Sequence, residues 1–132
     1  MKNINEYNVI GLAYLGDAVY ELYLRDYFLT HYSDNVNELQ KKVTQYVRAK
    51  GQALILEYLI NEQLLSEEEL DIVKRGRNYK RSNHPKNTDI ITYKLSTGFE
   101  TLIGWLYKDK NYRRIEELCK EALNENIWKE RM

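Results

Sequence analysis

The chain has 132 residues, of which 43% are hydrophobic and 30% charged, with six Gly and one Pro. This composition is typical of one soluble globular domain, expected to span residues 1–132, and excludes a disordered or loop-rich chain. The twenty basic and twenty acidic residues cancel, which excludes a uniformly basic surface. Cys119 is the single cysteine and no export signal is visible, so we expect a cytoplasmic protein without intramolecular disulfides.

The first predicted helix runs from about Asn5 to Phe28. Its apolar residues recur at steps of three and four, the spacing of one helical face: Leu12, Leu15, Val19 and Leu22. Because the other sides of this helix are also largely apolar, we expect it to be buried on more than one side. A dimer interface would supply the second covering. The stretch is too short and too interrupted by acids for a membrane span, so no membrane partner is expected.

The remainder of the chain is also predicted to be helical. One helix covers about 36–47, and it continues or restarts through 53–59. Ser66 and Glu69 form a capping box that begins a helix of about 67–79. A loop over 81–87 holds the only proline, and Asn87 or Thr88 then caps a helix that ends near Asp109. A last amphipathic helix contains Ile115, Leu118, Ala122 and Leu123. No strand is needed, so the predicted fold class is all-α.

Charge is strongly segregated in the second half of the chain. Residues 62–71 hold five acids and no base, whereas residues 74–94 hold seven bases and one acid. A neutral total therefore does not exclude a basic binding face. Guanidinium and ammonium groups suit phosphate oxygens, so this segment is a candidate nucleic-acid site. The alternative is a solvated helix face that balances the acids before it.

Two predicted helices each carry a carboxylate without a basic neighbour in the sequence, Asp17 and Glu100. A buried carboxylate needs a partner, and a divalent cation is one. Gly16, Gly98 and Gly104 lie within helical pattern, where each costs about 1 kcal/mol relative to Ala. Close approach of the two helices would explain the glycines and bring both acids within reach of one ion. The alternative is that the glycines serve packing only and the acids are solvated.

Three motifs, in this order, resemble Mini-ribonuclease III of the ribonuclease III endonuclease family: LAYLGDAVYE over residues 12–21, KRGRN over 74–78 and PKNTD over 85–89. The segment FETLIG over 99–104 is similar to that family's second catalytic segment. We expect no separate double-stranded-RNA-binding domain beside this match. The resemblance implies a homodimeric, all-α, Mg²⁺-dependent endoribonuclease that hydrolyses double-stranded RNA to 5′-phosphate and 3′-hydroxyl ends and matures the ends of 23S ribosomal RNA precursor.

The resemblance also assigns the residues. Asp17 and Glu100 match the catalytic, metal-binding acids, and the basic segment would contact RNA through Arg75, Arg77, Lys80 and Lys86. No small-molecule cofactor is expected. Where the larger ribonuclease III pattern has further acids, this chain has Ile10, Ala13 and Thr97. Fewer carboxylates should leave more waters on Mg²⁺, so one or two ions remain open. Glu21 either assists or is a surface residue.

Two other interpretations compete with the endonuclease. The first is a catalytically silent dimer that binds double-stranded RNA or acts in ribosome assembly, and the reduced number of acids favours it. The second is a structural helical adaptor, in which the isolated acids would reduce the stability of the fold and serve no function. The presence of both Asp17 and Glu100 argues for catalysis.

Overall fold

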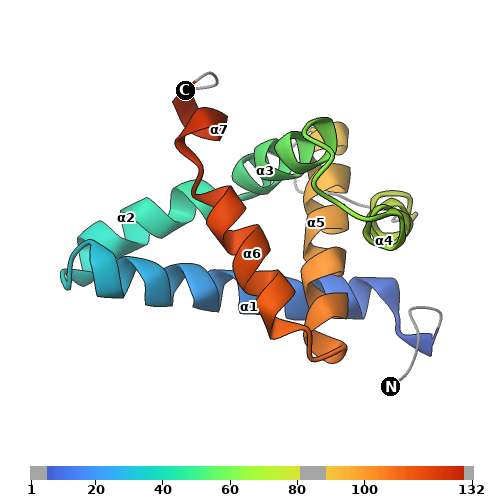
Figure 1. The fold of residues 1–132 in the computed structure, drawn as a ribbon, viewed down its shortest axis with the longest axis horizontal. Coiled ribbons are helices and arrows are strands. Elements are labelled where there is room, and N and C mark those ends of the chain that lie inside the picture. Colours follow the sequence, from blue (N-terminus) through green and yellow to red (C-terminus); the bar gives the residue numbers. More distant parts are fainter. Residues whose placement is uncertain (1–5, 81–88, 130–132) are drawn as a thin grey trace.

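The computed structural model describes residues 6–80 and 89–129, and within these ranges the chain forms seven helices and no strand (Figure 1). In chain order the helices are α1 (Val9–His31), α2 (Val36–Val47), α3 (Ala49–Asn61), α4 (Glu67–Arg77), α5 (Ile90–Lys108), α6 (Tyr112–Ala122) and α7 (Glu125–Lys129). The predicted all-α class is confirmed. None of these helices is long and apolar enough to cross a lipid bilayer.

Helix α5 forms the centre of the fold, packed against α1, α3 and α4 and, more lightly, against α6 (Figure 1). Every residue from Thr101 to Leu106 is buried. Phe99 of α5 meets the ring of Tyr20 from α1 edge-on, with centroids 5.0 Å apart. The buried Tyr20 hydroxyl donates to the carbonyl oxygen of Tyr46 in α2 at 3.2 Å. One aromatic contact and one hydrogen bond therefore join three helices around the core.

Side-chain caps set the beginnings of several helices, although α3 begins without one. Helix α1 begins at Val9 rather than near Asn5, because the Asn8 side chain accepts hydrogen bonds from the amides of Ile10 and Gly11. The predicted capping box of Ser66 and Glu69 is confirmed at the start of α4. Helix α5 is capped by Asp89. The prediction that Asn87 or Thr88 caps this helix is therefore wrong, because the Asp89 side chain accepts the hydrogen bond from the Thr92 amide. The predicted loop over 81–87 lies outside the described residues.

The buried face of α1 differs from the predicted one. Leu12 and Val19 are buried and Leu15 is half-buried, but the side chain predicted to complete the stripe, Leu22, is 64% exposed. The buried face instead follows Gly16, where α5 crosses the helix. The prediction followed the spacing of the apolar side chains, whereas the helix turns Gly16 toward α5.

Candidate active site

Helices α1 and α5 cross in direct backbone contact at two glycines. A Cβ atom built on Gly16 would overlap the carbonyl oxygen of Glu100 and lie 2.8 Å from its carbonyl carbon. A Cβ atom on Gly104 would overlap the carbonyl oxygen of Leu12 in the same way. No side chain fits at either position, which confirms the predicted close approach at Gly16 and Gly104. The crossing places the Glu100 turn of α5 directly against the residue that precedes Asp17.

The two candidate acids differ in environment. Asp17 is exposed in the single chain, and Glu100 is half-buried. The argument that a buried carboxylate requires a partner therefore does not hold for Asp17, because α1 turns Gly16 and not Asp17 toward α5. Asp17 lines an open depression of about 410 Å³ with Ala18, Glu21 and Leu22. It is accessible from solvent, as a residue that meets a large substrate must be.

The donor set around Asp17 and Glu100 is sparse. In the described part of the chain, no group of three or more His, Cys, Asp or Glu side chains is gathered in a way that could hold a metal ion. Glu21 forms an ion pair with Arg25, whose Nε donates to it at 2.8 Å. Thr97 is buried and its hydroxyl donates to the carbonyl oxygen of Tyr93 at 3.0 Å. Glu21 and Thr97 are thus both engaged within their own helices.

Helix α4 lies against the same part of α5, on a second pair of glycines. A Cβ atom on Gly98 would lie 2.9 Å from the carbonyl oxygen of Val73 and 3.5 Å from the amide nitrogen of Arg77. Gly98 therefore packs against α4 and not against α1, unlike Gly104. This contact brings the last turn of α4 alongside residues 98–101 of α5, next to Glu100.

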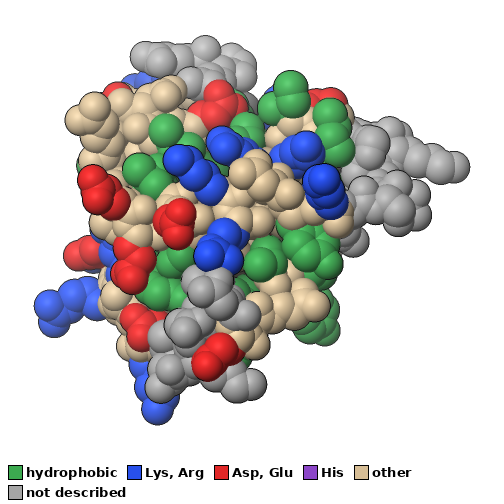
Figure 2. Space-filling model, turned by 90° about the vertical axis from the view of Figure 1, so that its right-hand side faces the viewer, with side chains coloured by type: hydrophobic (Ala, Val, Ile, Leu, Met, Phe, Trp, Pro, Cys, Tyr) green, Lys and Arg blue, Asp and Glu red, His purple; other side chains and the backbone are tan. Residues whose placement is uncertain are grey.

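The basic residues at the end of α4 and Lys80 after it are available to a ligand. Arg75 and Lys80 are exposed and Arg77 is half-buried, while Lys86 lies outside the described residues. Figure 2 views the molecule from the side on which α4 lies in Figure 1, and Lys and Arg side chains gather across the upper part of this face. Acidic side chains lie mainly toward one edge of the view. The neutral chain thus presents a locally basic surface beside the Glu100 turn.

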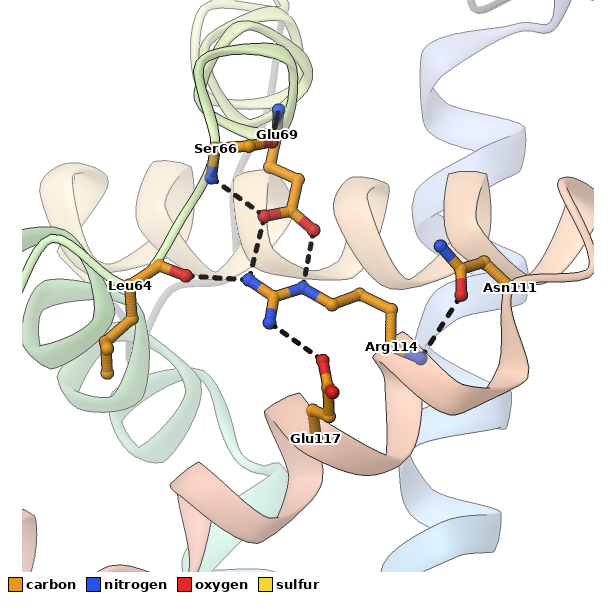
Figure 3. Close-up of polar contacts among 6 residues, drawn as sticks. All are labelled: Leu64, Ser66, Glu69, Asn111, Arg114 and Glu117. Carbon is orange, nitrogen blue, oxygen red and sulfur yellow. Dashed lines mark hydrogen bonds and ion pairs between the residues drawn. The ribbon is translucent and has the colours of Figure 1, made fainter.

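The opposite end of α4 is held by a partly buried ion pair that no local sequence pattern indicates (Figure 3). Arg114 of α6 donates to both carboxylate oxygens of Glu69, at 2.7 and 2.9 Å, and to the carbonyl oxygen of Leu64 at 2.7 Å. The partners are 45 residues apart, so no local pattern marks the pair. The sequence predicts Glu69 only as part of the capping box, whereas its carboxylate both accepts from the Ser66 amide and pairs with Arg114.

The ion pair shifts the pKa of both partners. Burial by itself would raise the pKa of the Glu69 carboxyl, but hydrogen bonds from Arg114 and from the Ser66 amide outweigh it and leave the pKa below its usual value. The bond to Glu69 raises the pKa of the Arg114 guanidinium. Both groups are therefore charged at neutral pH and tie α4 to α6.

Comparison with known proteins supports the resemblance seen in the sequence. Residues 11–111 match the model of the ribonuclease III domain. A Mini-ribonuclease 3 of Enterococcus faecalis is 42% identical over 118 residues, which is 89% of each chain. A Mini-ribonuclease 3 of Desulfitobacterium hafniense is 50% identical over 104 residues, 79% of this chain and 64% of the relative.

A solved structure shares the fold. The crystal structure of protein FN1578 from Fusobacterium nucleatum superposes with a TM-score of 0.81 at 36% identity, over 93% of this chain and 97% of that chain. The glycine crossing and the neighbouring basic helix lie within the matched domain. The chain therefore belongs to the ribonuclease III family, among the Mini-ribonuclease 3 proteins, and is an endoribonuclease.

Proposed function

We propose that this ribonuclease is a Mg²⁺-dependent enzyme that hydrolyses double-stranded RNA, acts as a cytoplasmic homodimer and matures the ends of 23S ribosomal RNA precursor. One observation carries the proposal. The backbone contact at Gly16 places the segments of Asp17 and Glu100 against each other, beside a basic helix. Acids for phosphodiester chemistry and cations for phosphate binding thus occur on adjacent elements.

The residues present fit a magnesium ion. Asp17 and Glu100 offer carboxylate oxygens, and Mg²⁺ is commonly bound through one or two carboxylates while it keeps several waters. When bound, the ion supplies a water of lowered pKa and neutralises charge on the phosphate. The sparse donor set supports one ion held by Asp17 and Glu100 for each site, while Glu21 forms an ion pair with Arg25.

The chain's own groups hold and orient the RNA. Arg75, Arg77 and Lys80, with Lys86, contact phosphate oxygens of the duplex, and guanidinium groups bind such oxygens in bidentate geometry. In-line attack of water on phosphorus breaks the bond to the 3′-oxygen, which takes up a proton. The products are a 3′-hydroxyl and a 5′-phosphate end. Since A-form RNA is read mainly through its backbone and 2′-hydroxyls, little sequence dependence is expected from these residues.

The homodimer is supported by an apolar surface on α1. Tyr14 is 83% exposed, Leu22 64% and Leu29 56%. These three residues and the exposed Ala18 between them follow one side of the helix at steps of four, four and seven residues. A second copy of this chain, packed on this side, would cover them. It would also place the partner next to the depression that Asp17 lines, with one active site for each RNA strand.

The test is cleavage of a long RNA duplex by the wild-type protein and the Asp17→Asn variant, at low salt, with Mg²⁺ and with EDTA. The proposal predicts that only the wild type with Mg²⁺ cuts, and that end-labelling finds 5′-phosphate products. A duplex that is shifted on a gel but stays intact in every reaction would instead favour the silent RNA-binding dimer. A gel-filtration mass of one chain would refute the homodimer separately.

A further inference from the structure

The contact between α4 and α5 leaves no space at a glycine of the basic helix. A Cβ atom on Gly76 would overlap the hydroxyl oxygen of Thr101, and it would lie 2.8 Å from the Cβ of Thr101 and 3.0 Å from the Cα of Gly98. Ordinary contacts begin at 3.4 Å. Gly76 lies in the middle of the KRGRN motif, and its position within a helical pattern is the signal that sequence reasoning left unused.

The atom that Gly76 faces is itself fixed. Thr101 is completely buried, and its hydroxyl donates to the carbonyl oxygen of Thr97 at 2.7 Å. Rotation of the side chain away from α4 would break this bond inside the core. Thr101 is also the residue directly after Glu100. The contact therefore sets the distance between the backbone of α4 and the turn that carries a candidate catalytic acid.

The two arginines on either side of Gly76 depend on this distance. Arg75 is exposed and Arg77 half-buried, and both are placed by the backbone of the same turn. The ion pair between Glu69 and Arg114 holds the start of α4 against α6 (Figure 3). With that end held, a methyl group at position 76 would move the basic turn outward by at least about 0.6 Å, the difference between 3.4 and 2.8 Å.

We propose that Gly76 is a positioning residue. Through its contact with Thr101 it sets the distance between the phosphate-binding arginines and Glu100. This inference rests on the proposed function. It predicts that a displaced α4 still binds the duplex, because Arg75 and Arg77 keep their charge and exposure. The bound scissile phosphate is then held away from the acids, so the loss falls on kcat and not on RNA affinity.

The experiment compares kcat with the dissociation constant for RNA measured in EDTA over a range of salt concentrations. For Gly76→Ala we expect kcat to fall about tenfold or more, with the dissociation constant and its salt dependence unchanged within about twofold. Thr101→Ala removes the fixed stop and is expected to lower kcat several-fold. The double variant Gly76→Ala with Thr101→Ala removes the overlap with the hydroxyl oxygen but keeps the Cβ contact at 2.8 Å, so its kcat is expected to exceed that of Gly76→Ala and to stay below that of the wild type.

The control is Val43→Ala in the core of α2, where Val43 is buried away from α4. It lowers thermal stability by a cavity and is expected to keep kcat. Equal kcat for Gly76→Ala and the wild type would overturn the inference, as would a double variant no better than Gly76→Ala. If Gly76→Ala does not fold, an unchanged kcat for folded Thr101→Ala would overturn it. A wild-type protein that cuts no duplex would overturn the proposed function first, and this inference with it.

Discussion

Substitution of Gly16 by Ala perturbs the crossing on which the site depends. The added Cβ would overlap the carbonyl oxygen of Glu100 and lie 2.8 Å from the Gly104 amide nitrogen. Both are backbone atoms, so no side chain can rotate away, and α1 and α5 must separate by more than 0.6 Å. Overpacking costs about 1–3 kcal/mol, and the better helix propensity of Ala returns about 1 kcal/mol. We expect a net loss of stability of up to about 2 kcal/mol.

The loss of activity should be larger than the loss of stability explains. A separation of this size moves Asp17 relative to Glu100, and small misplacements of catalytic groups cost about 10- to 100-fold in rate. The assay is single-turnover cleavage of an RNA duplex at a temperature where urea denaturation shows the variant to be folded. Gly11→Ala is the matched control, because a Cβ at Gly11 meets only the Asn8 Cβ at 3.7 Å. Wild-type cleavage by folded Gly16→Ala would refute the reasoning.

Further predictions concern the ion pair of Glu69 and Arg114, the RNA contacts and the buried thiol of Cys119. Arg114→Ala leaves the Glu69 carboxylate buried without its ion pair and should cost about 3 kcal/mol in urea denaturation. Because the Glu69 pKa is lowered in the fold, the stability that this carboxylate contributes is present at neutral pH and is lost as pH falls below its usual value and through the lowered one. The difference between the wild type and Glu69→Gln should therefore vanish in acid, and a constant difference would count against the ion pair. RNA affinity should fall steeply with salt, and Arg75→Ala should reduce the slope by about one if Arg75 contacts a phosphate; an unchanged slope would remove it from the interface. Burial raises the pKa of the Cys119 thiol to about 12, so a thiol reagent should label it only after unfolding, and rapid labelling of the native protein would contradict that burial.

The sequence was informative wherever the cause of a feature is local. Helical periodicity predicted most of the helices, and the spacing of Ser66 and Glu69 predicted the cap of α4, because caps and periodicity depend on neighbours in the chain. The glycines at positions 16 and 104 predicted a close approach of two helices. A glycine destabilises a helix, so its presence indicates a compensating tertiary contact. Helix α7 was not predicted. Its buried Ile127 and Trp128 fit too short a segment to show a period.

Features set by distant partners were not predictable in the same way. The exposure of Leu22 and of Asp17 depends on which side of α1 meets α5, and the apolar spacing predicted the burial of Leu12 and Val19 but not the exposure of Leu22. The pair of Glu69 and Arg114 joins elements 45 residues apart. The assignment of Asp17 and Glu100 as catalytic rests on family resemblance, and their geometry is what the structure adds.

The central claim is that the acids at the α1–α5 crossing perform the cleavage that the basic helix positions. The most direct measurement is the cleavage rate of one long RNA duplex by the wild type, Asp17→Asn and Glu100→Gln in Mg²⁺, with binding of each protein to the same duplex measured in EDTA. We predict equal binding by all three proteins and cleavage by the wild type alone. Cleavage at the wild-type rate by either variant would contradict the account.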